Sequence, residues 1–175
     1  MMITRILLAP GASGTIERLK PHRDGLAARG LEVELVTLPR ASAERALPVY
    51  REAVAGASGE VAIGGHSFGG RVASLLAAED PPAALVLLSY PLHAPGRHAA
   101  WDERTSHWPS IACPVLVLSG EADPFARIDL LRGAVDRLPD ATLRTWPRVG
   151  HGLGPVLDEA LEAIADFLRH AAGRT

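Results

Sequence analysis

The segment Gly65–Gly69 reads Gly-His-Ser-Phe-Gly and fits G-x-S-x-G, a pattern that holds a nucleophilic serine on a sharp turn. The apolar run Val61–Gly64 before it predicts a buried strand, and the stretch after Ser67 predicts a helix. This strand–turn–helix context is the one in which the motif performs chemistry. We therefore predict that Ser67 stands above a sheet with its hydroxyl free to attack. The alternative is a glycine-rich turn whose serine only caps a helix.

The neighbours of Ser67 predict how such a turn would work. Side chains in place of Gly65 and Gly69 would collide with the adjoining strand and helix, whereas glycine allows a close approach. The helix that begins at Ser67 would direct its positive end toward the site. We expect the backbone N–H of Phe68 to stabilise the oxyanion that forms when the serine attacks a carbonyl.

An acid and then a histidine should follow the serine along the chain. Asp123 comes soon after the apolar run Val115–Ser119, and His151 lies between two glycines after the last predicted strand. Both positions predict loops at the carboxyl edge of a sheet, where ligands bind in open α/β folds. We expect His151 to accept the Ser67 proton and Asp123 to orient the imidazole ring.

Each of these residues also has a simpler interpretation. Asp123 precedes a proline, as turn residues often do, and a histidine between glycines is often a solvated loop residue. Glu121 is a competing acid, although the template places the acid beyond the strand end and so favours Asp123. The ordered set of three favours the catalytic interpretation.

The loop Pro10–Gly14, Pro-Gly-Ala-Ser-Gly, follows the first apolar run. We expect it to supply the second oxyanion donor, the N–H of Ala12; otherwise it is an ordinary glycine-rich turn. It lacks the Gly-Lys-Ser/Thr of a phosphate-binding loop and the third glycine of a dinucleotide-binding fingerprint.

Six short runs predict the strands that would position these residues. Most are continuous in Val, Leu and Ile, as in strands buried on both faces of a parallel sheet, but residues 31–35 and 141–146 alternate. We expect the strand at residues 31–35 to lie nearer an edge of the sheet. The predicted strands are Ile3–Ala9, Leu31–Leu38, Val61–Gly64, Leu85–Ser89, Val115–Ser119 and Ala141–Trp146.

The stretches between these runs predict helices, at Ser67–Glu79, Ala126–Leu138 and Pro155–His170. Two earlier helices contain Pro21 and Pro48, and we expect each proline to mark a late helix start. Strands that alternate with helices indicate an α/β fold, a three-layer α/β/α sandwich with right-handed crossovers.

Residues 90–112 interrupt this rhythm with an irregular connection that is expected to be functional or to contain short helices. Tyr90, His93, Trp101 and Trp108 are candidates for the wall of a substrate pocket. Local packing is the alternative for Tyr90 and His93, and anchoring of the loop is the alternative for the tryptophans. His93, His98 and His107 do not match the spacing of a known zinc motif, so we predict no metal site and no cofactor.

Two further side chains have competing roles. Arg71, one turn into the predicted helix, could meet a substrate carboxylate or pair with an acidic loop, and we favour structural pairing. Cys113 precedes a proline at a strand entry and is expected to be a small buried hydrophobe rather than a nucleophile.

Across nearly its whole length the chain resembles the α/β-hydrolase superfamily, through Pro10–Ala12, the turn at Ser67, Asp123 and His151. The segments Gly64–Arg71, Leu87–Gly96 and Ser119–Phe125 resemble a small, lidless group near the dienelactone hydrolases. That group includes testis-expressed protein 30 and the hydrolase-like domain of NSL complex subunit 3.

The resemblance implies a Ser-His-Asp hydrolase fold. Because there is no room before Ile3 for the first two strands of the superfamily, we expect six mostly parallel strands in its order 4-3-5-6-7-8. Ser67 and Asp123 lie only 56 positions apart, so no large cap domain is expected. A shallow, open site would suit small acyl groups or the end of a larger partner.

Composition limits the remaining possibilities. The 175 residues are expected to form a single domain, residues 1–175, and a net charge of −2 argues against nucleic acid or anionic membranes as partners. One cysteine excludes an internal disulfide framework, and we expect a cytoplasmic protein with a small-molecule acyl substrate. The sequence predicts a serine hydrolase of carboxylic esters. The alternatives are a non-catalytic binding or scaffold protein of the same fold and an acyltransferase that uses the same three residues.

Overall fold

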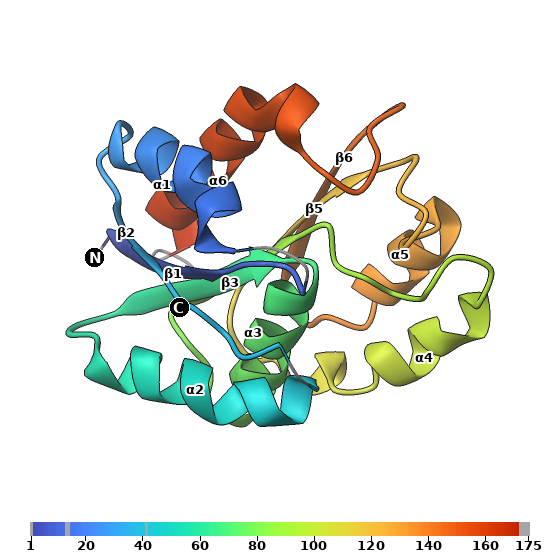
Figure 1. The fold of residues 1–175 in the computed structure, drawn as a ribbon, viewed down its shortest axis with the longest axis horizontal. Helices are drawn as coiled ribbons and strands as arrows, with labels where there is room; N and C mark the ends of the chain where they lie inside the picture. Colours follow the sequence, from blue (N-terminus) through green and yellow to red (C-terminus); the bar gives the residue numbers. More distant parts are fainter. Residues whose placement is uncertain (1, 13–14, 41, 172–175) are drawn as a thin grey trace.

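The computed structural model describes residues 2–12, 15–40 and 42–171. Its centre is one six-stranded parallel sheet with the strand order β2-β1-β3-β4-β5-β6. This order confirms the expected topology and the α/β sandwich without a cap domain (Figure 1). The strands are β1 (Arg5–Ala9), β2 (Glu32–Leu35), β3 (Val61–His66), β4 (Ala84–Leu88), β5 (Val115–Gly120) and β6 (Ala141–Trp146).

The burial of each strand follows its sequence pattern. The four central strands are almost wholly buried, because helices cover both of their faces. The edge position of β2 confirms the prediction for residues 31–35. At the other edge, β6 alternates between exposed and partly buried residues.

The helices form two layers. Helices α1 (Lys20–Ala27) and α6 (Leu157–Ala171) cover one face of the sheet, and α2 (Ala43–Gly56) and α3 (Phe68–Glu79) cover the other (Figure 1). Successive strand residues serve the two layers in turn: Leu7 and Ile63 pack toward α2 and α3, whereas Ile6 packs toward α1 and α6. Helix α5 (Ile128–Val135) packs into the hydrophobic core on the α2 and α3 side of the sheet, through Leu131 and Ala134.

The two prolines behave differently. Pro21 lies in the first turn of α1 and marks a helix start, as predicted. For Pro48 the prediction was wrong, because α2 begins at Ala43, with Ser42 as its N-cap. Pro48 is exposed, so the Glu44 carbonyl that loses its helical hydrogen bond lies on the solvent side, where water can replace the bond.

Residues 90–112 contain three short helices: η2 (His98–Ala100), α4 (Trp101–Arg104) and η3 (Trp108–Ser110). Trp108 is fully buried and contacts Tyr90 edge to face, with 4.9 Å between ring centroids. The segment is therefore tied to the body of the protein by aromatic burial. No helix in the described part of the chain is long and apolar enough to cross a membrane.

Candidate active site

Ser67 lies on the turn between β3 and α3, and its backbone adopts φ 51° and ψ −116°. A positive φ is unfavourable for a residue with a side chain, so the surroundings must hold it in place. The Ser67 N–H donates to the carbonyl of Leu88 on β4 at 2.8 Å, and the Ser67 carbonyl accepts from Arg71 N–H at 3.0 Å. Sheet and helix thus fix the turn from both sides.

The glycines beside Ser67 are required by close backbone packing. A Cβ on Gly69 would lie 2.2 Å from the carbonyl oxygen of Ala9 on β1. A Cβ on Gly65 would lie 2.5 Å from the carbonyl carbon of Gly69. Both distances are far inside van der Waals contact, which agrees with the collision expected from the sequence.

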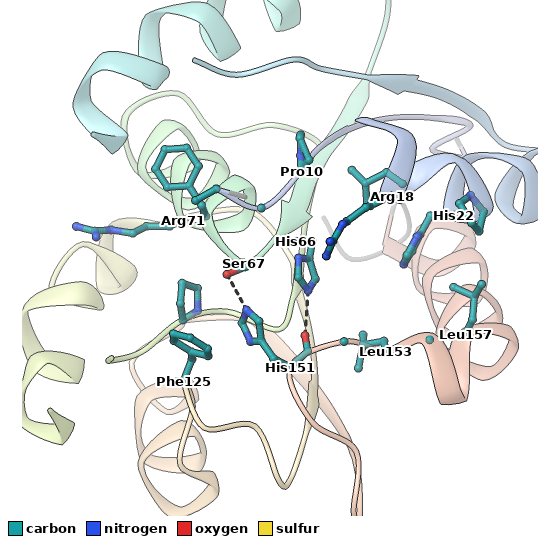
Figure 2. Close-up of a pocket in the computed structure, with 18 of the residues that line it drawn as sticks. Pro10, Arg18, His22, His66, Ser67, Arg71, Phe125, His151, Leu153 and Leu157 are labelled. Atoms are coloured by element: carbon teal, nitrogen blue, oxygen red, sulfur yellow. Dashed lines mark hydrogen bonds between the residues drawn. The ribbon is translucent and has the colours of Figure 1, made fainter. Parts of the chain in front are cut away.

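His151 joins Ser67 to Asp123 in one hydrogen-bonded chain. Its Nε2 lies 2.9 Å from Ser67 Oγ (Figure 2), and its Nδ1 lies 2.8 Å from Asp123 Oδ2. Because a carboxylate only accepts, Nδ1–H donates to Asp123 and the Nε2 lone pair faces the serine hydroxyl. Asp123 is 4% exposed, and its second oxygen accepts from Phe125 N–H at 2.8 Å.

The competing acid, Glu121, points elsewhere. Its Oε1 accepts a hydrogen bond from Thr145 Oγ1 at 2.7 Å and lies 3.7 Å from Arg132 Nη2. Glu121 directly follows the end of β5. Asp123 lies two residues further along the loop, and its carboxylate is the one that reaches His151.

The loop after β1 lies against the nucleophile. A Cβ on Gly11 would lie 3.6 Å from Ser67 Cβ and 3.2 Å from His66 Nδ1. Ala12 and Phe68, the expected oxyanion donors, both border the cavity that Ser67 faces. Ser13 and Gly14 of the same loop lie outside the described residues.

His66 was not singled out from the sequence, where it is only the variable residue before the serine. Its Nε2–H donates to the carbonyl of His151 at 3.0 Å (Figure 2), and the two rings lie 5.1 Å apart. Burial lowers the pKa of His66, which favours the neutral ring. His66 therefore holds the backbone of the histidine that contacts Ser67.

A cavity of about 790 Å³ opens over Ser67. Figure 2 shows Arg71 on one side of Ser67, and Arg18, His22 and Leu157 on the other. Burial lowers the pKa of His22 to about 4, and its Nδ1 has no hydrogen-bond partner among the described residues. The lining residues are Pro10–Ala12, Arg18, Leu19, Pro21, His22, His66–Phe68, Arg71, Pro91, Ala94, Arg104, Phe125, His151–Gly154 and Leu157.

The structure places the four expected wall residues outside this lining. Tyr90 and Trp108 are fully buried beneath it, and the Tyr90 hydroxyl donates to the carbonyl of Arg104 at 2.7 Å. Their large rings pack into the core under the segment, because that burial holds an otherwise irregular connection in place.

His93 and Trp101 also serve the segment itself. His93 is 1% exposed; its Nδ1–H donates to the carbonyl of Ala94 at 2.9 Å, and its Nε2 accepts from Arg127 N–H at 3.1 Å. Trp101 lies under the guanidinium of Arg137, 4.3 Å from the ring centroid. Within the described ranges, no group of three or more His, Cys, Asp or Glu side chains is arranged to hold a metal ion.

Comparison with known proteins agrees with this architecture. The family described as "Alpha/beta hydrolase domain" matches residues 39–172, and the chain belongs to this family. A search of curated proteins found no match.

Solved structures share the fold at low sequence identity. A monoacylglycerol lipase from Paleococcus ferrophilus has a TM-score of 0.84 at 16% identity, over 95% of this chain and 94% of that one. Est1E from Butyrivibrio proteoclasticus with ferulic acid bound has a TM-score of 0.82 at 15% identity, over 99% of this chain and 91% of that one. A thermophilic esterase from Thermogutta terrifontis with malate bound has a TM-score of 0.76 at 19% identity, over 98% of this chain and 91% of that one.

Proposed function

We propose that this protein is a serine hydrolase that cleaves a carboxylic ester or a related small acyl bond through an acyl-enzyme on Ser67. The observation that carries the proposal is the chain of hydrogen bonds from Asp123 through His151 to Ser67, which ends at an open cavity. The strained backbone at Ser67 supports it, because a non-glycine residue with positive φ persists only where the surroundings impose it.

In the first half-reaction, Ser67 Oγ attacks the carbonyl carbon of the ester while its proton moves to His151 Nε2. The resulting oxyanion would be stabilised by the N–H groups of Ala12 and Phe68. As the bond between the carbonyl carbon and the leaving oxygen breaks, His151 returns the proton to that oxygen. An alcohol leaves, and the acyl group remains on Ser67.

In the second half-reaction, a water molecule attacks the acyl carbon and gives its proton to His151. The bond to Ser67 Oγ then breaks, and Oγ recovers the proton from His151. The carboxylic acid is released. Asp123 stays ionised throughout and stabilises the imidazolium through Nδ1.

Three narrower expectations belong to the same proposal. The motifs at Gly64–Arg71, Leu87–Gly96 and Ser119–Phe125 support membership of the lidless group near the dienelactone hydrolases. The substrate would be a small acyl compound rather than a nucleic acid or a membrane. The protein would work in the cytoplasm.

The test is the intact mass of the folded protein after exposure to a fluorophosphonate. We expect one adduct on the wild type and on Ser58→Ala, which removes an exposed serine of the α2–β3 loop, and no adduct on Ser67→Ala. A panel of 4-nitrophenyl esters, with and without a competing alcohol, then separates hydrolysis from acyl transfer. Absence of an adduct on protein that circular dichroism shows to be folded would contradict the proposal and favour a scaffold.

A further inference from the structure

Three arginines without acidic partners among the described residues border the cavity of Ser67: Arg18 is exposed, whereas Arg71 and Arg104 are half-buried. Arg71 projects from α3 and Arg104 from α4, and both border the cavity together with Pro91 and Phe125. Arg104 Nη1 donates to the carbonyl of Pro91 at 2.9 Å, which fixes its side chain along that wall. Within the described part of the chain, no Asp or Glu side chain lines the cavity.

The other arginines of this protein follow a different rule. Most of them form ion pairs, as Arg127 does with Asp129 at 2.6 Å. The arginines without a carboxylate partner among the described residues are otherwise exposed; they are Arg18, Arg40, Arg45, Arg97 and Arg148. Among the described arginines, only Arg71 and Arg104 are half-buried and also lack a carboxylate partner. Among the residues that the structure describes, the structural pairing expected for Arg71 is therefore not formed.

No neighbour of Arg71 among the described residues forms an ion pair with it. His107 Nε2 is hydrogen-bonded to Ser74 Oγ at 2.8 Å, and burial, together with the charge of Arg71, lowers the pKa of His107 to about 4. Burial raises the pKa of Tyr90, so its hydroxyl stays protonated. Glu44, whose carboxylate feels the charge of Arg71, is fully exposed on α2 and hydrogen-bonded at the start of its own helix.

The two guanidinium groups also act on each other. Desolvation lowers the pKa of Arg104 most, and the positive charge of Arg71 lowers it further. Two cations are therefore held in a cavity wall that is partly shielded from water. Such an arrangement costs free energy unless an anion completes it. A guanidinium presents several N–H donors in one plane, which suits the two oxygens of a carboxylate.

We propose that Arg71 and Arg104 bind an ionised carboxylate of the substrate, so that the preferred substrates are esters with a second, free carboxyl group. This inference rests on the proposed function, because it assigns a substrate class to the same cavity. The carboxylate would lie on the Arg71 side of Ser67. The uncharged part of the molecule would extend toward Leu153 and Leu157 on the other side (Figure 2).

The experiment measures binding without chemistry, by calorimetry on Ser67→Ala protein with three hydrolysis-resistant amides. Butyranilide is neutral, glutaric acid monoanilide has a carboxylate on the acyl side, and 4-butyramidobenzoic acid has one on the leaving-group side. We expect one of the two anionic amides to bind about 10- to 100-fold more tightly than butyranilide, as charge-assisted hydrogen bonds predict. Which one it is tells on which side of the scissile bond the carboxylate lies.

Matched variants test the residues. Arg71→Gln and Arg104→Gln, each added to Ser67→Ala, should reduce the anion preference about tenfold or more. Arg71→Lys should keep part of it, and Arg45→Gln, at an exposed position in the first turn of α2 that does not border the cavity, should keep all of it. Equal binding of all three amides would overturn the inference. The inference would also be overturned if the anion preference persisted in Arg71→Gln and Arg104→Gln but was lost in Arg18→Gln.

The outcome is separable from that of the proposed function. A protein that reacts with the fluorophosphonate but shows no anion preference keeps the hydrolase proposal and loses this inference. A protein that prefers the anionic amides but does not react with the fluorophosphonate keeps the binding site and loses the hydrolase proposal.

Discussion

The buried carboxylate of Asp123 holds His151 in the tautomer that leaves Nε2 free for Ser67. Asp123→Asn offers an amide in place of that carboxylate and can favour the wrong tautomer. We expect it to lower kcat with 4-nitrophenyl acetate by about 10⁴-fold. Glu121→Gln, the matched change two residues away, removes the charge near Arg132 but keeps an acceptor for Thr145, and it should change kcat by less than about threefold.

The measurement is steady-state kinetics on both variants after their folding has been verified by circular dichroism. Equal loss of activity in the two variants would contradict the assignment of Asp123. Residual turnover near the wild-type value in Asp123→Asn would contradict it too.

His107 makes stability depend on pH. Burial lowers its folded pKa from 6.5 to about 4, so between these values the unfolded chain takes up a proton that the folded protein does not. Its contribution is therefore complete above about pH 6.5 and is lost as the pH falls toward 4. Burial of His22 acts in the same direction.

We expect the free energy of unfolding of the wild type to fall between pH 7.5 and pH 5.0. In His107→Gln that fall should be smaller by about 1 kcal/mol, after allowance for partial exposure. Urea titrations at the two pH values measure the difference. The same pH dependence in the wild type and the variant would show that His107 is not held neutral.

The junction of β1, β3 and α3 depends on glycines, whereas α5 contains a glycine with free space around it. Gly69→Ala places a methyl group against the Ala9 carbonyl and should lower the free energy of unfolding by about 2–3 kcal/mol. Gly133→Ala, exposed on α5 with nothing within 4 Å of the added carbon, should raise it by about 0.5–1 kcal/mol.

Urea unfolding of both variants gives the two free energies, and fluorophosphonate labelling reports on the turn itself. Gly69→Ala should also slow labelling, because the turn and its serine move together. A neutral effect of Gly69→Ala on stability and labelling would mean that the sheet and helix can separate without cost.

Helix α2 shows where element-level patterns are insufficient. A proline inside a helical pattern normally indicates a boundary, yet α2 continues through Pro48, because the N-cap at Ser42 and the buried faces of Ala43, Ala46 and Tyr50 stabilise the first turns. The Tyr50 hydroxyl also donates to the carbonyl of Gly64 at 2.6 Å, beneath the turn that contains Ser67. The Ser42 N-cap and the burial of this helix face, rather than the position of the proline, decide where the helix begins.

On the scale of the whole molecule, two hydrophobic cores pack on opposite faces of one sheet, and we expect them to unfold together in one cooperative event. Cys113 lies in one of these cores, 4% exposed, and burial raises the pKa of its thiol to about 12. This confirms the expectation of a small buried hydrophobe. We expect native Cys113 to react with an aromatic disulfide reagent on the order of 10³-fold more slowly than the unfolded chain.

The rate of thiol modification is followed against urea concentration. Its rise should share a midpoint with the loss of ellipticity, since one cooperative unfolding event exposes the thiol. Fast modification in native buffer would show that the core opens locally around Cys113.

Sequence alone was sufficient for the features that depend on local order. The turn at Ser67 follows from glycine spacing between an apolar run and a helical stretch, and the edge position of β2 follows from its alternation. The candidate residues Ser67, Asp123 and His151 could be chosen because parallel strands bring their carboxyl ends to one edge. Periodicity and turn chemistry act over a few residues, which is why they can be read without coordinates.

The tertiary structure alone decided which side chains face the cavity. The path of residues 90–112 depends on the burial of Tyr90 and Trp108, so these side chains, expected in the wall, became anchors, and Arg104 came to border the same cavity as Arg71. The contact of His66 with the His151 carbonyl likewise joins residues 85 positions apart. The direction in which each of these side chains points is set by packing between distant segments, and no local pattern in the sequence encodes it.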